Sequence, residues 1–302
     1  MKPLKIQRSY DVTFSPDGKH LATTSRRVSV WDLQARKKIF SAHPLPHPAS
    51  LAYSPSGKQL AVKSTSGQIV ILEGRSGEML CDFMNKRDGE GSNLLFSPCG
   101  EYIIDGSWAG RLSVRRVQTG EIEFTREFSG EMIAAVHASA DGQQWFIQHA
   151  RKAHMPGSGG PSDYFTCWSW PFKTLAVLNL VPPGPIVRLV SSALVPKGDK
   201  LAAVFGASPC ILGIFGIADG RQLLETGIQH GGTGNAISWS PSGDSLGSVQ
   251  SGKIIIHSSL SLSAIYELPM DYPSDIAFSP SGDLVAFGSW ECGSVRSLSD
   301  FW

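Results

Sequence analysis

Two loops of the sequence contain the same three residues and end in a tryptophan that could anchor a partner. They are Gly106-Ser107-Trp108 and Gly288-Ser289-Trp290. Tryptophan, tyrosine and arginine carry much of the binding energy at protein interfaces, so an exposed ring at a loop tip favours partner binding. Two basic pairs, Arg26-Arg27 and Lys86-Arg87, would attract an acidic peptide or a phosphate.

Residues arranged for catalysis or metal binding are harder to find. The sequence has no Walker-type phosphate loop and no His-Glu-x-x-His motif. His43 and His47 are four residues apart, but the prolines at 44, 46 and 48 prevent the helix that would bring them together. The five cysteines are widely spaced without a Cys-x-x-Cys pair, so we expect neither disulfides nor structural zinc. We therefore predict no catalytic residue, no metal site and no cofactor.

The overall composition excludes several classes of partner. The net charge is +1, so no general field attracts nucleic acid, and we expect none as a partner. No stretch reaches the roughly 20 apolar residues of a membrane span, and the N-terminus lacks the apolar run of a signal peptide. We therefore expect a cytoplasmic protein. Its 32 glycines and 19 prolines predict many turns and few long helices.

A short phrase recurs along the whole chain: an aromatic or apolar residue, then Ser-Pro-x-Gly, then a short apolar run. Five copies are intact and two are degraded, which makes seven. The central positions of the copies are Pro16, Pro55, Pro98, Ala140, Pro196, Pro241 and Pro280. They are 39 to 45 residues apart, except for 56 between Ala140 and Pro196. Such spacing is typical of four-stranded propeller blades of about 40–45 residues.

The phrase predicts a hairpin between two strands. Proline fixes φ at the first central turn position, and glycine accepts the positive φ that closes the turn. A third strand follows each hairpin, as in Val28–Leu33 and Ile69–Leu72, and several are apolar at consecutive positions. A strand with one solvent-exposed face would alternate apolar and polar residues instead. These strands should therefore be buried on both faces, as in blades stacked around an axis.

The last repeat is one strand short, and the N-terminus has one strand to spare. After Phe278 we expect three strands before the chain stops, whereas Leu4–Gln7 precedes the first repeat. A strand from the start that closed the last blade would leave no open edge in the ring. The fold class predicted is all-β: one seven-bladed propeller of four-stranded antiparallel blades over residues 1–302.

At this point the chain resembles the WD-repeat family. Trp31-Asp32 ends a third strand, where that family keeps its signature dipeptide, and turns such as Gln118–Glu121 resemble its link to the fourth strand. Other repeats have Leu72-Glu73, Arg115-Arg116 or His257-Ser258 instead. The family's His–Ser/Thr–Asp–Trp network cannot be assembled in most blades, so we expect apolar packing to hold them.

The resemblance implies that one face carries the loops from strand two to three and from each blade to the next. That face would present the predicted partner-binding residues: Arg26, Arg27, Lys86, Arg87, Trp108, Tyr272 and Trp290. Two other interpretations stay open: the tryptophans could pack between blades, and the basic residues could be solvated loop charges, diluted by Asp271 and Glu291. The Gly/Ser/Pro-rich segment 151–163 is equally open to a functional or a tolerated role.

Two functions follow as hypotheses. The first is a non-catalytic scaffold that binds a protein or peptide through the loop face. The alternative is a propeller hydrolase or lyase with a site at the central funnel, which would require acidic side chains converging on the axis.

Overall fold

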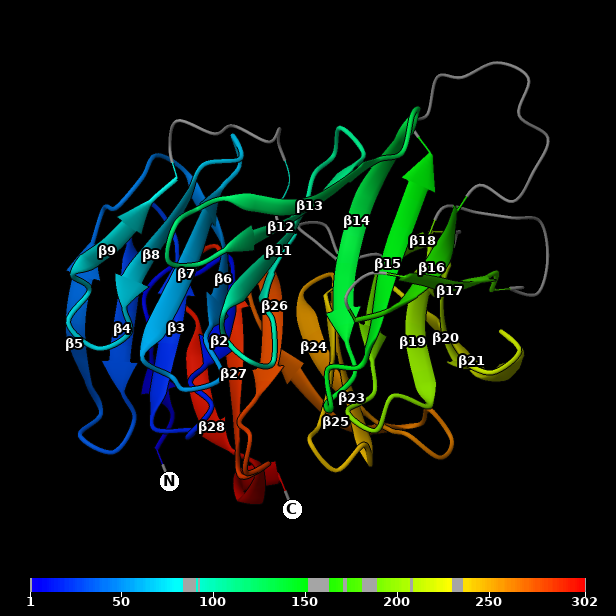
Figure 1. Ribbon diagram of the computed structural model, residues 1–302. Helices are drawn as coiled ribbons and strands as arrows, with labels where there is room; N and C mark the ends of the chain where they lie inside the picture. The colour runs from blue at the N-terminus through cyan, green and yellow to red at the C-terminus, as the bar shows by residue number, and fades with distance from the viewer. Residues whose placement is uncertain are drawn as a thin grey trace.

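The described residues form seven four-stranded antiparallel sheets in a closed ring (Figure 1). The computed structural model describes residues 2–83, 91, 93–151, 163–170, 173–180, 189–206, 209–229 and 236–301. The first strand of each sheet contacts the first strand of the neighbouring sheets, from β2 round to β26 and back to β2. The predicted fold class is therefore confirmed. We number the blades 1 to 7, from the sheet that begins with β2.

Each blade is built in the same order from the axis outward. The innermost strands are β2 (Val12–Phe14), β6 (Pro48–Tyr53), β10 (Asn93–Phe96), β14 (Glu131–Ala138), β18 (Leu189–Leu194), β22 (Ile237–Trp239) and β26 (Pro273–Phe278). The second strands are β3 (His20–Thr24), β7 (Gln59–Ser64), β11 (Tyr102–Gly106), β15 (Gln144–Arg151), β19 (Lys200–Phe205), β23 (Ser245–Gln250) and β27 (Leu284–Ser289).

The outer half of each blade follows the same rule. The third strands are β4 (Val28–Asp32), β8 (Ile69–Glu73), β12 (Arg111–Arg116), β16 (Asp163–Ser169), β20 (Cys210–Gly216), β24 (Lys253–Ser258) and β28 (Ser294–Ser297). The outermost strands are β5 (Lys37–Ala42), β9 (Met79–Asp82), β13 (Ile122–Glu127), β17 (Lys173–Leu178), β21 (Gln222–Ile228), β25 (Ala264–Pro269) and, for blade 7, β1 (Leu4–Lys5). A short 3₁₀ helix, Leu298–Phe301, follows β28.

The hairpins lie where the repeated phrase predicts them. In blade 1 the Gly18 N–H donates to the Ser15 carbonyl at 2.9 Å, and Gly18 has a φ of 69°. The Ser15 hydroxyl also accepts from the His20 N–H at 2.9 Å, which fixes the start of the next strand. The degraded copy at Val195 keeps the backbone bond to Gly198 although it has lost the serine. The turn thus forms with proline and glycine but without the serine hydroxyl.

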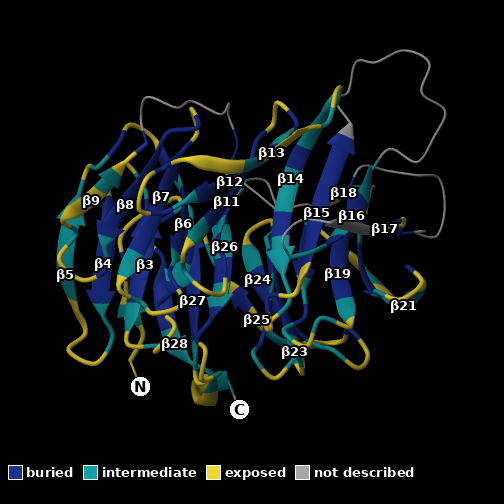
Figure 2. Cartoon of the chain, in the orientation of Figure 1, coloured by how far each residue is buried: buried dark blue, intermediate teal, exposed yellow. Residues whose placement is uncertain are grey.

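Apolar packing between blades holds the ring together, and strands such as β4, β8 and β19 are buried along most of their length (Figure 2). Seven clusters of buried apolar side chains lie between successive blades, and each contains residues of the two blades that it joins. Third strands such as β4 and β8 are buried at four consecutive positions. Both faces of these strands are therefore covered, as the run of apolar residues predicts.

One buried ion pair interrupts the apolar interface between blades 2 and 3. The Lys63 ammonium contacts the Asp105 carboxylate and donates to the Gly106 carbonyl at 2.9 Å. Both charged side chains are inaccessible to solvent. Burial raises the pKa of Asp105, and the Lys63 charge opposes that rise. Because removal of either partner would leave a buried charge, this pair makes the match between the two blades specific.

The N-terminal strand closes the ring. β1 pairs antiparallel with β28 through Leu4–Val295 and Lys5–Ser294, so blade 7 takes strands from both ends of the chain. Ile6 follows β1, is only 1% exposed, and packs in the cluster between blades 7 and 1. Its N–H also donates to the Gly293 carbonyl at 2.9 Å.

The signature tryptophan of blade 1 lacks the side-chain bond expected from the family. Trp31 is buried, but its indole N–H has no hydrogen-bond partner among the residues that the structure describes. In blade 4, by contrast, the Trp168 indole donates to the Thr166 hydroxyl at 2.6 Å. In blade 6 His257, which pairs with Leu246 as Trp31 pairs with Leu21, bonds to the Ser248 hydroxyl at 2.9 Å.

Deleting residues 1–8 should destabilise the whole protein. The deletion removes the outermost strand of blade 7 and the buried Ile6, and large losses from a core cost about 2–5 kcal/mol per side chain. We expect the free energy of unfolding in urea to fall by about 3 kcal/mol or more. Removal of residues 1–2 is the control. Equal unfolding midpoints for the two deletions would contradict closure by β1.

Trp31→Phe and Trp168→Phe should differ in cost. The first leaves no hydrogen bond unmade and should lower the free energy of unfolding by less than about 1 kcal/mol. The second breaks the bond to the buried Thr166 hydroxyl, which keeps its bond to the His149 ring, so it should cost about 0.5–1.5 kcal/mol more than the first. Urea titrations followed by circular dichroism measure both. The interpretation is wrong if the Trp31 variant proves the less stable of the two.

Candidate partner-binding site

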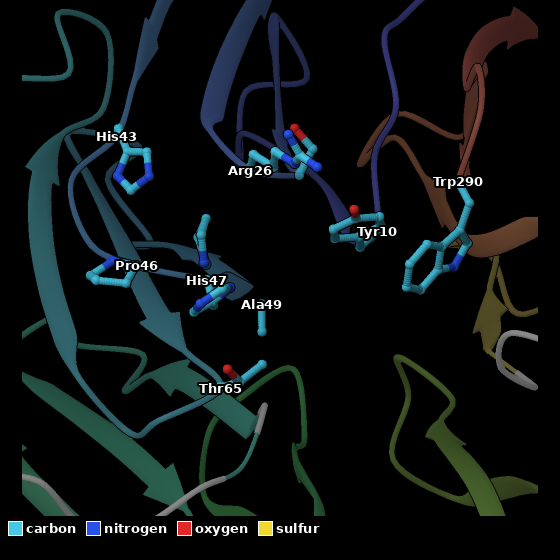
Figure 3. A pocket seen from close by; sticks show the side chains of 10 residues that line it. Tyr10, Arg26, His43, Pro46, His47, Ala49, Thr65 and Trp290 are labelled. Carbon is cyan, nitrogen blue, oxygen red and sulfur yellow. The ribbon is translucent and has the colours of Figure 1, made fainter.

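A pocket of about 650 Å³ opens among the loops of blades 7, 1 and 2 (Figure 3). These are the loops from second to third strand and from one blade to the next, on the face opposite the hairpins. The volume lies within the range of roughly 300–1,000 Å³ that ligand pockets occupy. The lining residues are Tyr10, Ser25, Arg26, His43, Pro46, His47, Pro48, Ala49, Thr65 and Trp290.

One wall is a rigid segment between blades 1 and 2. In residues 43–48 prolines alternate with other residues, and each proline fixes a backbone torsion. Leu45 is buried in the cluster between the two blades and anchors the segment. The His47 carbonyl accepts the Thr65 N–H at 3.1 Å, while His47 has a φ of 51°, which is uncommon for a residue other than glycine. A wall fixed in this way loses little entropy on binding.

The opposite wall is an aromatic pair. The rings of Tyr10 and Trp290 lie with centroids 4.4 Å apart and planes inclined by 40°. Tyr10 precedes β2, and Trp290 follows β27, so the pair joins blades 1 and 7. The backbone N–H of Trp290 donates to the Tyr272 carbonyl at 3.0 Å, which fixes the loop. Tyr272 has a φ of 45°.

The predicted aromatic anchors are all partly exposed to solvent. Trp108 is 39% exposed, Trp290 42% and Tyr272 60%. Only Trp290 of these three lines the pocket. Trp290 is thus partly exposed and also packs on Tyr10 of the neighbouring blade, and the role of these rings in binding stays a prediction.

The two arginines of the blade 1 loop differ in their surroundings. The Arg27 side chain donates to the Ser41 hydroxyl at 3.0 Å and to its carbonyl at 2.7 Å, which holds it against β5. Arg26 lines the pocket and makes no hydrogen bond or ion pair with the residues that the structure describes. Lys86 and Arg87 lie outside the described residues, as do His230 and most of the segment 151–163.

Four of the face residues occupy one position of the repeat. Arg26, Thr65, Trp108 and Trp290 each follow the hairpin proline of their blade by the same ten residues. They therefore lie at equivalent places on blades 1, 2, 3 and 7, which are consecutive in the ring. These positions are far apart in the sequence. The shared offset from the hairpin proline would have identified them together, although Thr65 was not among the predicted residues.

A comparison with family models matches residues 7–32 to the WD domain, G-beta repeat. These residues make up most of blade 1, and six more blades of the same strand order complete the ring. The chain is a seven-bladed propeller whose first blade matches the WD repeat. No curated protein matches its sequence.

Solved structures with the same fold are distant in sequence from this WD-repeat propeller. Kuenenia stuttgartiensis hydrazine synthase superposes with a TM-score of 0.79 at 14% identity, over 97% of this chain and 96% of that one. A structure of U3-55K gives a TM-score of 0.77 at 14% identity, over 98% of each chain. At such identities the likeness shows the fold alone.

The central channel of the WD-repeat propeller contains two acidic side chains. It has a volume of about 550 Å³ and is lined by the innermost strands, and Tyr10 and Ala49 line both the channel and the pocket. Asp11 and Asp275 lie in it side by side, hydrogen-bonded to each other. Among the described residues, no group of three or more acidic, histidine or cysteine side chains could hold a metal ion.

Each carboxyl of this pair also bonds to the next blade. Asp275 accepts the Val12 N–H at 2.8 Å, and Asp11 accepts the Leu51 N–H at 2.7 Å. Asn93 has the same place in the repeat, and its amide donates to the Ile133 carbonyl at 3.0 Å. The position thus joins neighbouring blades at the axis. Burial raises the pKa of Asp11 to about 6, while burial and the adjacent Asp11 raise the pKa of Asp275 well above its ordinary value.

One sequence motif that is typical of hydrolases can be interpreted only with the structure. Gly243-Asp244-Ser245-Leu246-Gly247 fits the Gly-x-Ser-x-Gly pattern of a nucleophile elbow, which is a turn from a strand into a helix. Here Ser245 begins β23 after a hairpin and pairs with Ser258. The segment is therefore an ordinary blade hairpin. No described helix has the length and apolar character needed to cross a membrane.

Asp275→Asn should change how stability depends on pH. A carboxyl whose pKa rises on folding stabilises the protein while protonated, below about pH 4, and this contribution is lost as the pH rises through about 6. An asparagine can still accept the Val12 N–H and can donate to Asp11, so the pair would no longer need a shared proton. Above pH 6 the variant should be more stable than the wild type by about 1–3 kcal/mol.

Urea titrations of both proteins from pH 4 to pH 7 measure this difference. Burial lowers the pKa of His137 and His149 to about 4, which gives a pH dependence of the opposite sign. Subtracting the wild-type curve removes their contribution. Parallel curves for the two proteins would contradict a shared proton.

Proposed function

We propose that this WD-repeat propeller is an interaction scaffold that binds a protein or peptide partner through its loop face. The observation that carries the proposal is the open pocket between blades 7, 1 and 2. It combines an aromatic pair, an arginine without a partner among the described residues, and a proline-stiffened wall. Aromatic and arginine anchors in a preformed pocket are typical of binding hot spots.

The family supports the coarser part of this proposal, because WD-repeat propellers typically bind protein partners. The fold by itself does not separate a scaffold from an enzyme, since one superposed structure carries the name of a synthase and the other does not. The pocket, and not the fold, therefore favours a scaffold. A cytoplasmic location stays a prediction.

The alternative, a hydrolase or lyase at the central funnel, has one observation in its favour. The channel is open, and Asp11 and Asp275 converge there, with one of them needing a proton to bond to the other. However, both carboxyls already accept backbone N–H groups of the neighbouring blade. Their repeat position is a structural tie in blade 3 as well, through Asn93. We therefore favour binding over catalysis.

Affinity capture from the native cell, followed by quantitative mass spectrometry, tests the scaffold. We expect Trp290→Ala to reduce recovery of the partner by about tenfold or more, since a hot-spot side chain contributes about 2 kcal/mol or more. Lys58→Ala, on an exposed hairpin of the opposite face, is the matched control and should leave recovery unchanged.

A partner that is retained by Trp290→Ala and lost with Lys58→Ala would place binding on the hairpin face and refute the proposed site. Trp108→Ala distinguishes how far the partner reaches. A loss of recovery there would extend the contact from the pocket to blade 3.

A further inference from the structure

The described lining of the pocket has basic side chains but no acidic ones, which favours a negatively charged occupant. Among the described lining residues, the ionisable side chains other than the Tyr10 phenol are basic: Arg26, His43 and His47. No carboxylate belongs to this described lining. Arg26 is exposed, and Figure 3 shows it between the His43 wall and the Tyr10 ring.

Two other arginines, Arg111 and Arg116, with side chains 38% and 37% exposed, pair with acidic side chains within the fold. Arg111 bonds to Glu127 at 2.8 Å, and Arg116 pairs with Glu123. Arg26 has no such bond with the described residues. The rest of the described lining is mainly proline, alanine and aromatic rings, with two histidines and the Ser25 and Thr65 hydroxyls. A guanidinium beside low-dielectric walls interacts more strongly with an incoming carboxylate than one in open water.

The acidic residues closest to the site in the sequence indicate how a charged ligand would be oriented in the pocket. Asp271 and Glu291 are exposed and flank Tyr272 and Trp290 in blade 7. They would repel a negative group at the aromatic end of the pocket. A negative group is therefore favoured only at the other end, near Arg26 and the two histidines, while an apolar ring fits against Tyr10 and Trp290.

We propose that the pocket binds an acidic peptide segment in which an aromatic or proline side chain lies next to a carboxylate. The ring packs against Tyr10 and Trp290, and the carboxylate pairs with the Arg26 guanidinium in the two-point geometry that arginine offers. The acidic end points to blades 1 and 2, and the ring end to blade 7. This inference rests on the proposed peptide-binding function.

Selection from a random dodecapeptide display library on the full-length protein tests it. Bound peptides are then rescreened on Trp290→Ala, Arg26→Glu and Arg27→Glu. We expect the peptides that require Trp290 to be enriched in Asp or Glu next to Trp, Phe, Tyr or Pro. Arg26→Glu should weaken them by about tenfold or more, because an ion pair is replaced by like charges. Arg27→Glu is the matched charge control, since Arg27 is bonded to Ser41, and should change affinity by less than about threefold.

The possible failures are distinguishable. Peptides that require Trp290 but lack acidic residues, or that bind Arg26→Glu as well as wild type, would overturn this inference and keep the pocket as a peptide site. Equal losses with Arg26→Glu and Arg27→Glu would also overturn it, because they would indicate a general charge effect. If no selected peptide requires Trp290, the proposed function fails as well.

Discussion

A blade of this chain can bury both faces only if it has a neighbour on each side, and the rest of the structure depends on this constraint. The third strands are apolar on both faces, so an open stack would leave two of them exposed to water. Closure is achieved where β1 joins β28, and the cluster around Ile6 and Val295 covers that joint. The loop face, the channel and the pocket exist only because the ring is complete.

The chain meets this constraint with little help from the polar network of its family. Trp31 is held by packing, whereas Trp168 and His257 bond to hydroxyls in their own blades. Specific neighbours are instead selected by a few buried polar contacts across interfaces. The Lys63–Asp105 pair matches blades 2 and 3, and the carboxyl pair at the axis matches blade 7 to blade 1. Apolar clusters supply the general stability, and these contacts add a polar pairing at two of the interfaces, which would be costly to break.

Much of the fold could be predicted from the sequence because the repeat records local geometry. Proline and glycine in the hairpins mark the seven blades. The missing strand of the last repeat and the extra strand at the N-terminus predict the closure by β1. The candidate site was harder to predict from the sequence. Trp290 was found as an exposed ring, but its contact with Tyr10 joins residues at opposite ends of the chain. The bond that holds Arg27 and leaves Arg26 in the pocket depends on a side-chain direction, which no spacing encodes.

The aromatic pair draws one ring from residue 10 and the other from residue 290. A ribosome that has made the first six blades has therefore not yet made this wall. During synthesis, a partner that requires both rings would pass over every unfinished chain and recognise only molecules whose two ends have met. Once bound, it would also resist the opening of that joint, because a ligand stabilises the state that binds it. The same two side chains would then bind the partner and report that the ring is closed.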